Sequence, residues 1–543
     1  MSVAEKLQAQ FPDTVYTALA PPDRHPGFNY KGFHPGRVTR LPRGHVKEPG
    51  YQAFPVDVTW EEDQAIPMRD GIKLYADIFR PADESEKVPA IIPWSPYGKV
   101  GTSTLNYDNM GPWRIGIPYQ NLSGYETFEE AVDIYDTITW ISEQPWCDGS
   151  VVIAGNSWLA ISQLNFASRF QHPNLKAIAP WEGLTDLYAH QICRGGIPKP
   201  AFFELILHGS AGVGKAENIG AMVKSRPLFD EYWEEKRINP EDIKDIPMYL
   251  TASYSTGLHC EGSFRAFELA QTSRKWLRVH STQEWHDLYR PEATDDLQRF
   301  YDYYAKGYDG SITKTIVERP EEQWPPARQH IRRYYLDAAT QSFNAVKPVN
   351  SASITYEGHS LTASSDFTLT FDKYTELCGR PFVKLYMSSN VKDDFDVVVQ
   401  IRKVSVSGEL LESLNWSPMP APGPKVPNVN VVKHLGQQGM LRASHHVSLQ
   451  PRASEDDVPV YDHRSREAIT PGEIVPLLIP IWPLGVVFEA GEGLMLRISG
   501  HDMSLPEAES LRLTAPVDDN EGQHTVYTGG EYESYLAIPV IKG

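Results

Sequence analysis

Short apolar runs and amphipathic stretches follow one another over the first 325 residues. An Asp-Gly turn between the alternating runs 56–66 and 72–79 predicts a β-hairpin. Apolar residues recur at helical spacing over 125–144, and short apolar runs typical of buried strands occur at 151–154 and 175–179. Helix and strand in alternation indicate a parallel sheet with helices on its faces.

The alternation breaks at 187–245, where helical patches without a clear strand predict an inserted helical cap. It returns with predicted strands at 247–252 and 276–279 and a helix at 295–305. After a Pro-rich junction the chain holds only short strands between turn residues, which favours an all-β sandwich or jelly roll. The predicted domains are an irregular arm at 1–55, an α/β domain in two parts at 56–186 and 246–325, the cap at 187–245, and the β domain at 326–543.

Composition and charge exclude several classes of protein. The 543 residues carry a net charge of -19, which argues against a nucleic-acid partner. The four cysteines are scattered, so we expect neither a zinc site nor a disulfide framework, and a cytoplasmic location. The N-terminus opens no apolar run, so no signal peptide is expected. The apolar run 474–488 contains three prolines and predicts strands rather than a membrane helix.

The sharpest local signal is the sequence Gly155-Asn156-Ser157-Trp158-Leu159. A predicted strand leads into Gly-x-Ser and an apolar helix follows, which is the setting of a nucleophile elbow. In such a turn the serine Oγ is exposed at the end of the sheet, and the next backbone N–H faces the developing oxyanion. The match to G-x-S-x-G is partial, because Leu159 stands at the last position. A buried serine that caps the helix is the structural alternative.

Several ordered motifs resemble the CocE/NonD family of serine hydrolases, which includes cocaine esterase, α-amino-acid ester hydrolases, glutaryl-cephalosporin acylases and, more distantly, X-Pro dipeptidyl-peptidases. They are the segment 140–149 leading into 154–158, then 180–188, 441–445 and 485–491. The resemblance spans about residues 55–540. It implies an α/β-hydrolase domain with an inserted helical cap, followed by a C-terminal jelly roll.

The resemblance assigns roles residue by residue. Ser157 would be the nucleophile, and the backbone N–H of Trp158 one oxyanion donor. The segment Trp94-Ser95-Pro96-Tyr97-Gly98 matches the place of a second donor, the Tyr97 hydroxyl. The general base belongs after the strand at 276–279, where His280 and His286 both stand. We favour His280, which follows the strand directly.

The triad acid is where the chain departs from the family pattern. Family members carry an Asp after the strand at 247–252, but here Ser255 follows Tyr254. We therefore expect that the acid is Glu182, just beyond the neighbouring strand, with Asp186 and Glu261 as alternates. The alternative reading of Glu182 is a cap at the entry to the inserted segment. His259, His445 and His446 lack ligand partners at metal spacing and are expected to be packing or surface residues.

These observations predict a serine acyl hydrolase that forms an acyl-enzyme on Ser157 and shuttles the proton through His280. Its expected partner is a small ester or amide; no cofactor, metal, nucleic acid or membrane is expected, and a homo-oligomer is compatible with the resemblance. Esters are favoured, since X-Pro dipeptidyl-peptidases often carry a larger N-terminal domain than the arm at 1–55. An aminopeptidase of that type is the alternative enzyme, and a non-catalytic binding protein on a degenerate hydrolase scaffold is the alternative class.

Overall fold

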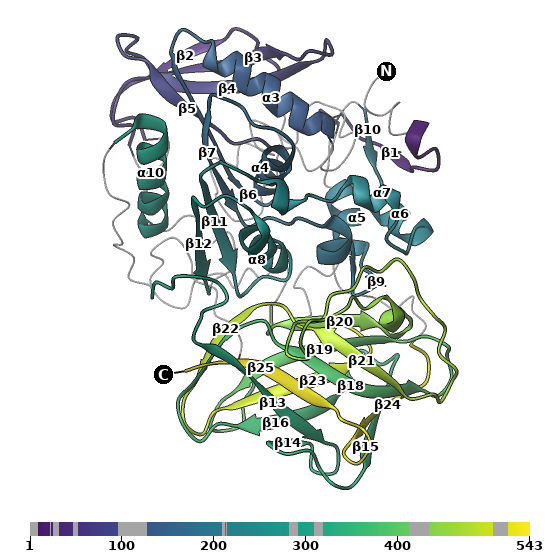
Figure 1. The fold of residues 1–543 in the computed structure, drawn as a ribbon. Helices are drawn as coiled ribbons and strands as arrows, with labels where there is room; N and C mark the ends of the chain where they lie inside the picture. The colour runs from purple at the N-terminus through teal and green to yellow at the C-terminus, as the bar shows by residue number, and fades with distance from the viewer. Residues whose placement is uncertain are drawn as a thin grey trace.

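The computed structural model has one part of sheets and helices, drawn at the top of Figure 1, and one part built mainly of strands, drawn below it. It describes residues 9–21, 23–24, 32–46, 53–95, 128–208, 212, 214–281, 291–308, 319–411, 434–502 and 520–542. Tyr97 and His286 lie outside these residues, as do the segments 412–433 and 503–519.

A five-stranded parallel sheet forms the centre of the N-terminal part, with the strand order β12-β11-β7-β6-β5. Its strands are β5 (Val88–Ile92), β6 (Cys147–Asn156), β7 (Leu175–Trp181), β11 (Met248–Ser253) and β12 (Lys275–His280). The helices that accompany it are α3 (Phe128–Ser142), α4 (Trp158–Arg169), α8 (Cys260–Leu269) and α10 (Pro291–Lys306). The predicted alternation of helix and strand is confirmed, whereas α8 was not among the predicted elements.

Successive side chains of β6 point to opposite faces of the sheet and enter two different cores. Val151 and Ile153 pack with apolar residues of α3, α4 and α8, and Val152 packs with α10. Helices therefore cover both faces, as Figure 1 shows for α10 on one side and α4 and α8 on the other. This double coverage explains why the strands read as continuous apolar runs rather than as alternating ones.

The predicted hairpin is confirmed as β3 (Val58–Pro67) and β4 (Lys73–Pro81), which pair antiparallel. The arm before it is not wholly irregular, because it contributes β1 (Tyr16–Ala18) and β2 (Val38–Leu41). β2 pairs with β3, and β1 pairs with β10 (Lys215–Glu217). Strands of three or four residues are too short to show an alternating pattern, so only their distant partners define them.

The segment predicted as a helical cap holds helices and also strands that the pattern did not predict. Its helices are α5 (Ala201–His208), α6 (Ile219–Ser225) and α7 (Glu231–Glu235), with the π-helical turn Tyr188–Ile192 and the 3-10 turn Pro240–Asp242. Besides β10 it contains the two-residue strands β8 (Cys193–Arg194) and β9 (Ile197–Pro198), which form a small hairpin. Gly195 in the turn of this hairpin lies against the β domain, since its carbonyl oxygen accepts the N–H of Arg442 at 2.7 Å.

The C-terminal part is all β, as predicted, apart from a 3-10 turn at Ala443–Ser448 within the described residues. Its strands are β13 (Gln329–Asp337), β14 (Ser342–Asn344), β15 (Ala352–Glu357), β16 (Ser365–Thr370), β17 (Thr375–Gly379), β18 (Phe382–Ser389), β19 (Asp396–Val404), β20 (Gln438–Arg442), β21 (Val475–Pro480), β22 (Leu484–Phe488), β23 (Gly493–Ser499), β24 (Gln523–Thr528) and β25 (Tyr535–Ile541). All pairings are antiparallel except that of β14 with β16.

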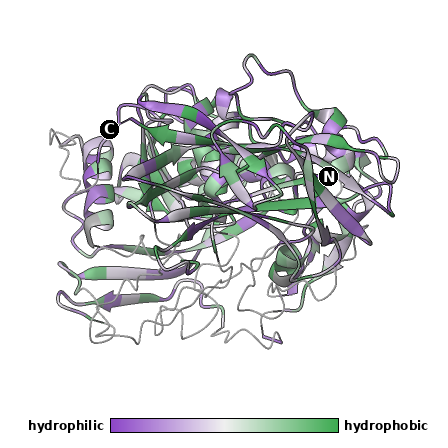
Figure 2. Ribbon diagram, turned by 90° about the horizontal axis from the view of Figure 1, so that it is seen from below, coloured by the Kyte–Doolittle hydropathy of each residue, from purple (hydrophilic) through white to green (hydrophobic). Residues whose placement is uncertain are grey.

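Hydrophobic residues gather on the central strands and hydrophilic ones on much of the rim, as the view from below shows (Figure 2). The run 474–488 becomes β21 and β22, which confirms strands in place of a membrane helix. In the part of the chain that the structure describes, no helix is long and apolar enough to cross a bilayer.

Candidate active site

Ser157 occupies a strained turn between β6 and α4. Its backbone has φ 61° and ψ -122°, a region that non-glycine residues rarely adopt. The N–H of Ser157 donates to the carbonyl oxygens of Trp181 at 3.2 Å and Glu182 at 3.0 Å, so the turn is held against the end of β7. Strain of this kind persists only where neighbouring structure enforces it, and it is a feature of functional sites. The geometry is that of a nucleophile elbow.

The partial match to the elbow motif has a steric explanation. Gly155 has φ 138°, and a Cβ built on it would lie 2.4 Å from the Cβ of Leu159. Because Gly155 has no side chain, there is room for Leu159, which stands where the G-x-S-x-G motif has its second glycine. On the other side of the turn, Ala160 packs against Gly183, where an added Cβ would lie 3.3 Å away.

The imidazole that lies next to Ser157 is that of His259. The distance from Ser157 Oγ to His259 Nε2 is 3.4 Å, which is long for a hydrogen bond. Catalytic hydrogen bonds are often long without substrate and shorten when it binds. The His259 side chain is buried, with 2% of its surface exposed. The sequence analysis expected a packing or surface residue; it did not predict that the imidazole faces Ser157.

His259 reaches the serine because α8 packs unusually closely on the loop after β7. A Cβ on Gly262 would lie 2.3 Å from the Cα of Leu184, so only glycine fits there. Ser263 Oγ accepts the N–H of Gly183 at 3.0 Å and fixes the same contact. Since His259 precedes the first residue of α8, the docking of this helix decides where its imidazole lies.

Glu182 and His280, predicted as acid and base, form a buried pair at the ends of β7 and β12. Glu182 Oε1 and His280 Nε2 are 2.5 Å apart, and both side chains are nearly inaccessible to solvent. The two residues that the sequence proposed as acid and base therefore do contact each other. It also placed His280 on Ser157, and in this respect the structure differs: His280 Nε2 faces Glu182, and His259 faces the serine.

The backbone of Glu182 connects this pair to the elbow. Glu182 has φ 58°, the second strained residue at this end of the sheet. Its carbonyl oxygen accepts the N–H of Ser157, while its carboxylate binds His280. A shift of the Glu182 side chain would therefore also move the Glu182 carbonyl oxygen, which holds the N–H of Ser157. The reading of Glu182 as a simple cap at the entry to the inserted segment has no support in these contacts.

Trp158, the proposed oxyanion donor, is anchored by a buried carboxylate. Its indole Nε1 donates to Glu130 Oε1 at 3.0 Å, and Trp94 Nε1 donates to the same oxygen at 3.3 Å. Burial raises the pKa of Glu130, and the two indole N–H donors offset part of this rise. Glu130 thus joins the first residue of α4 to Trp94. Tyr97, the second proposed donor, falls outside the described residues, as does the alternate base His286.

The two alternate acids have structural partners instead. Asp186 Oδ1 accepts the N–H of Ala189 at 2.8 Å and so begins the π-helical turn. Glu261 binds Arg380 of the β domain and accepts from Arg265 Nε at 2.9 Å. Burial raises the pKa of Glu261, but Arg380 and Arg265 outweigh it and lower the value to about 2. Glu261 is therefore an ion-pair partner between the two parts of the molecule.

His259 carried a weak signal in the sequence. The stretch from His259 to Gly262 and Ser263 begins a helix whose small residues permit close packing, but the sequence pattern does not predict a helix there. A histidine is also common as a buried polar residue, and nothing local relates His259 to Ser157, which is 102 residues away. The other two histidines that were expected to be packing or surface residues, His445 and His446, lie in the β domain. There His445 Nδ1 is 3.0 Å from His463 Nδ1.

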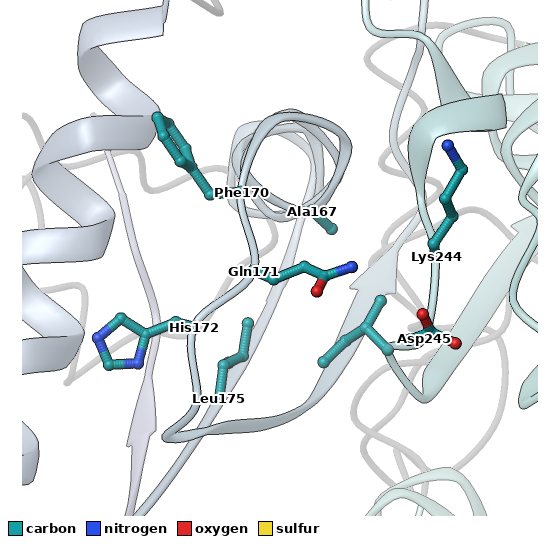
Figure 3. A pocket seen from close by; sticks show the side chains of 8 residues that line it. Ala167, Phe170, Gln171, His172, Leu175, Lys244 and Asp245 are labelled. Carbon is teal, nitrogen blue, oxygen red and sulfur yellow. The ribbon is translucent and has the colours of Figure 1, made fainter.

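The described residues contain no group of three or more metal-ligating side chains. Figure 3 shows a cavity of about 120 Å³. It lies at the opposite end of the sheet from Ser157, since Leu175 begins β7 whereas Ser157 follows the last residue of β6. It is bounded by the end of α4 and the start of β7, including Ala167, Leu175 and Lys244. The proposed chemistry is thus unrelated to this cavity.

Comparisons with known proteins agree with the two-part architecture. Residues 106–226 match the family model of X-Pro dipeptidyl-peptidase (S15 family), and residues 299–537 match that of the X-Pro dipeptidyl-peptidase C-terminal non-catalytic domain. Cocaine esterase from Rhodococcus sp. (strain MB1 Bresler) is 34% identical over 136 residues, a stretch that spans only 23% of this chain and 23% of the esterase.

Solved structures extend the likeness over the whole chain. A CocE/NonD family hydrolase from Staphylococcus aureus has a TM-score of 0.80 at 26% identity, and the match covers 97% of this chain and 99% of that one. An α-amino-acid ester hydrolase has a TM-score of 0.60 at 15% identity over 88% of this chain and 96% of that one, which is a likeness of fold. The architecture is an α/β-hydrolase-like domain with a C-terminal β-rich domain.

Proposed function

Because the chain belongs to the CocE/NonD family of hydrolases, we propose that it cleaves a carboxylic ester or amide through an acyl-enzyme on Ser157. The observation that carries the proposal is the strained elbow of Ser157 with His259 Nε2 at 3.4 Å from its Oγ. A serine that only caps a helix needs no imidazole beside it, and Ser157 makes no capping hydrogen bond with its side chain. Activated serines have this arrangement of nucleophile and base.

In the proposed mechanism His259 Nε2 accepts the proton of Ser157 Oγ as the oxygen attacks the carbonyl carbon. The carbonyl oxygen becomes an oxyanion, which the backbone N–H of Trp158 at the start of α4 stabilises. His259 then donates the proton to the departing alcohol or amine, and the acyl group stays on Ser157. Water repeats the sequence, with His259 as base, and releases the acid.

Glu182 and His280 act in this proposal as positioning residues. Their buried hydrogen bond holds the residue whose carbonyl oxygen accepts the Ser157 N–H, and thereby maintains the strained turn. The expectation from the sequence, in which His280 is the base and Glu182 its acid, predicts that a His280 variant loses more activity than a His259 variant. The mechanism proposed here predicts the opposite order. That difference makes the two mechanisms separable by experiment.

The experiment that tests the function compares wild type with Ser157→Ala. Both are incubated with a fluorophosphonate probe, with p-nitrophenyl acetate and butyrate, and with Ala-Pro-p-nitroanilide. We expect a single adduct by intact mass and release of nitrophenol in wild type, with both lost in the variant. Preferential release of nitroaniline would favour the dipeptidyl-peptidase alternative suggested by the match at 106–226. A folded wild type with neither adduct nor turnover would identify a non-catalytic binding protein.

A further inference from the structure

Arg380 of the β domain binds both ends of α8, the helix that begins directly after His259. It lies between β17 and β18, and its side chain is buried. Its Nη1 donates to Glu261 in the first turn of α8. Its Nε and Nη2 donate to Oε1 and Oε2 of Glu268 in the last turn, at 3.0 and 3.1 Å. One side chain of the β domain therefore contacts the helix at two places.

The helix supplies only part of these bonds from its own residues. Glu261, Arg265 and Glu268 are four and three positions apart, so they share one face of α8. Arg265 Nε donates to Glu261 Oε1 at 2.9 Å, but Arg265 Nη1 is 3.8 Å from Glu268 Oε2, too far for a hydrogen bond. Glu268 is held instead by Arg380 and by Trp324 Nε1, which donates to Glu268 Oε1 at 3.1 Å. The far end of α8 is thus fixed by the domain junction and the β domain.

Burial makes these bonds important for the position of the helix. Burial lowers the pKa of Arg380, but Glu261 and Glu268 outweigh this effect and raise the pKa above its usual value. Removal of one partner from a buried ion pair leaves an uncompensated charge, which is costly. Without Arg380, a carboxylate of α8 would have to take up water or a proton, and the helix would lose its bond to the β domain.

The β domain also contacts α8 directly beside the candidate base. Cys260 follows His259, and its Sγ lies 3.7 Å from the carbonyl oxygen of Pro483 in the β domain. Gly262 lies two residues later, about half a turn around the helix, and packs on Leu184 in the loop after β7. The first turn of α8 therefore lies between this loop and the β domain. Both contacts determine where the imidazole of His259 lies.

We propose that Arg380 is a positioning residue, which fixes α8 on the β domain through Glu261 and Glu268 and so holds the imidazole of His259 at Ser157. The proposal rests on the proposed function, because it names a residue that sets the geometry of that site. Arg380 itself transfers no proton. Through this residue the β domain takes part in catalysis by placing the base.

The test replaces the guanidinium of Arg380 by a single ammonium group. Arg380→Lys keeps the buried positive charge but cannot bind two carboxylates with the same geometry. We expect kcat for p-nitrophenyl acetate and the rate of Ser157 labelling by a fluorophosphonate to fall at least about 10-fold, because a small displacement of the base suffices for that loss. KM should stay within about twofold of wild type. An unchanged kcat in a folded Arg380→Lys variant, or a loss confined to KM, would overturn the proposal.

Arg442→Lys is the matched control. Arg442 is also a largely buried arginine of the β domain, and its Nε and Nη2 donate to the two oxygens of Asp396 at 2.7 and 2.9 Å. Because Asp396 belongs to β19 rather than to α8, Arg442→Lys should lower Tm but leave kcat within about twofold of wild type. An equal fall of kcat in the two variants would indicate general destabilisation and would overturn the proposal.

Glu268→Gln provides the test if Arg380→Lys does not fold. Glu268 is about two and a half helical turns from His259, so any effect on catalysis must pass through the position of α8. We expect kcat to fall at least about fivefold with KM unchanged, and a wild-type kcat would overturn the proposal.

A wild type that is neither labelled nor active would contradict the proposed function instead. Hydrogen exchange of the peptide 259–269, followed by mass spectrometry, then decides whether Arg380 fixes α8. Exchange should be at least about 10-fold faster in Arg380→Lys than in wild type and unchanged in Arg442→Lys. Equal exchange in wild type and Arg380→Lys would overturn the proposal.

Discussion

The two ends of the parallel sheet both carry buried polar side chains, but they are built in different ways. At the carboxyl end, the four residues Ser157, Glu182, His259 and His280 lie at the ends of different elements: after β6, after β7, before α8 and at the end of β12. Their contacts join residues 102 and 98 positions apart in the chain. At the amino end, His172 lies 3.0 Å from Thr139 Oγ1 and accepts the N–H of Asn174 two residues on, at 3.1 Å.

The difference shows which buried histidine is positioned for chemistry. His172 has one partner two residues away in the chain and another 33 residues away, so its contacts span much shorter stretches of sequence than those at the carboxyl end. The histidines at the carboxyl end have partners that only the tertiary structure supplies, beside two residues with positive φ. Convergence of distant elements on one strained turn is a better indicator of a site than the presence of a cavity, which here lies at the amino end.

Among variants that leave the catalytic side chains unchanged, the largest effect is expected from disturbing the docking of α8. Gly262→Ala adds a Cβ that meets the Cα of Leu184 at 2.3 Å, so the helix must move and carry His259 away from Ser157. We expect turnover of p-nitrophenyl esters to fall roughly 100-fold and the free energy of unfolding to fall by about 1–3 kcal/mol. Gly220→Ala in α6 is the control, since its Cβ would meet the flexible Glu204 side chain at 3.0 Å and the Pro200 Cβ only at an ordinary contact distance of 3.4 Å. Equal turnover in the two variants would contradict the role of α8.

The sequence predicted the sheet, its covering helices and the elbow because these depend on local patterns. It also predicted the pair Glu182 and His280, since each follows a recognisable strand of a familiar topology. It missed His259 because that residue acts through a helix packed on Gly183 and Leu184, a contact with no local signature. The short strands β1 and β2 were missed because only their pairing with β10 and β3 defines them. The strands β8 and β9 pair with each other, but two residues are too few to show a pattern.

A smaller effect is expected from the positioning pair. Glu182→Gln keeps the size of the side chain but weakens its bond to His280, so the strained backbone at Ser157 becomes less rigid. We expect kcat to fall about 10-fold with little change in KM. Glu143→Gln on the surface serves as the control for loss of one carboxylate. A wild-type kcat in Glu182→Gln would remove this residue from the site, and a loss above about 1,000-fold would identify it as the triad acid.

Buried histidines outside the site should affect stability rather than turnover. Burial lowers the pKa of His445 to about 4 and that of His463 to about 3, from a value near 6.5 in the unfolded chain. The unfolded state therefore binds more protons than the folded state below about pH 6.5, and stability decreases as the pH falls toward 4. His463→Asn should reduce the drop in Tm between pH 7 and pH 5 by a few degrees and leave ester turnover at pH 7 unchanged. An undiminished drop in Tm would contradict this assignment.

The smallest effect is expected at the amino end. His172→Ala removes the bond to Thr139 and costs about 1 kcal/mol of stability, but ester turnover should stay within about twofold of wild type. Steady-state assays and chemical denaturation of the same preparation measure both quantities. A large loss of turnover without loss of stability would mean that the two ends of the sheet do not differ in function.

The most direct test of the account is the rate at which a fluorophosphonate labels Ser157 in His259→Ala and in His280→Ala, followed by intact mass. Labelling requires an activated serine and no knowledge of the substrate. If His259 is the base, its variant should lose at least about 1,000-fold in labelling rate, and His280→Ala should lose about 10-fold through the weakened turn. The reverse order would contradict the account and establish His280 as the base with Glu182 as its acid.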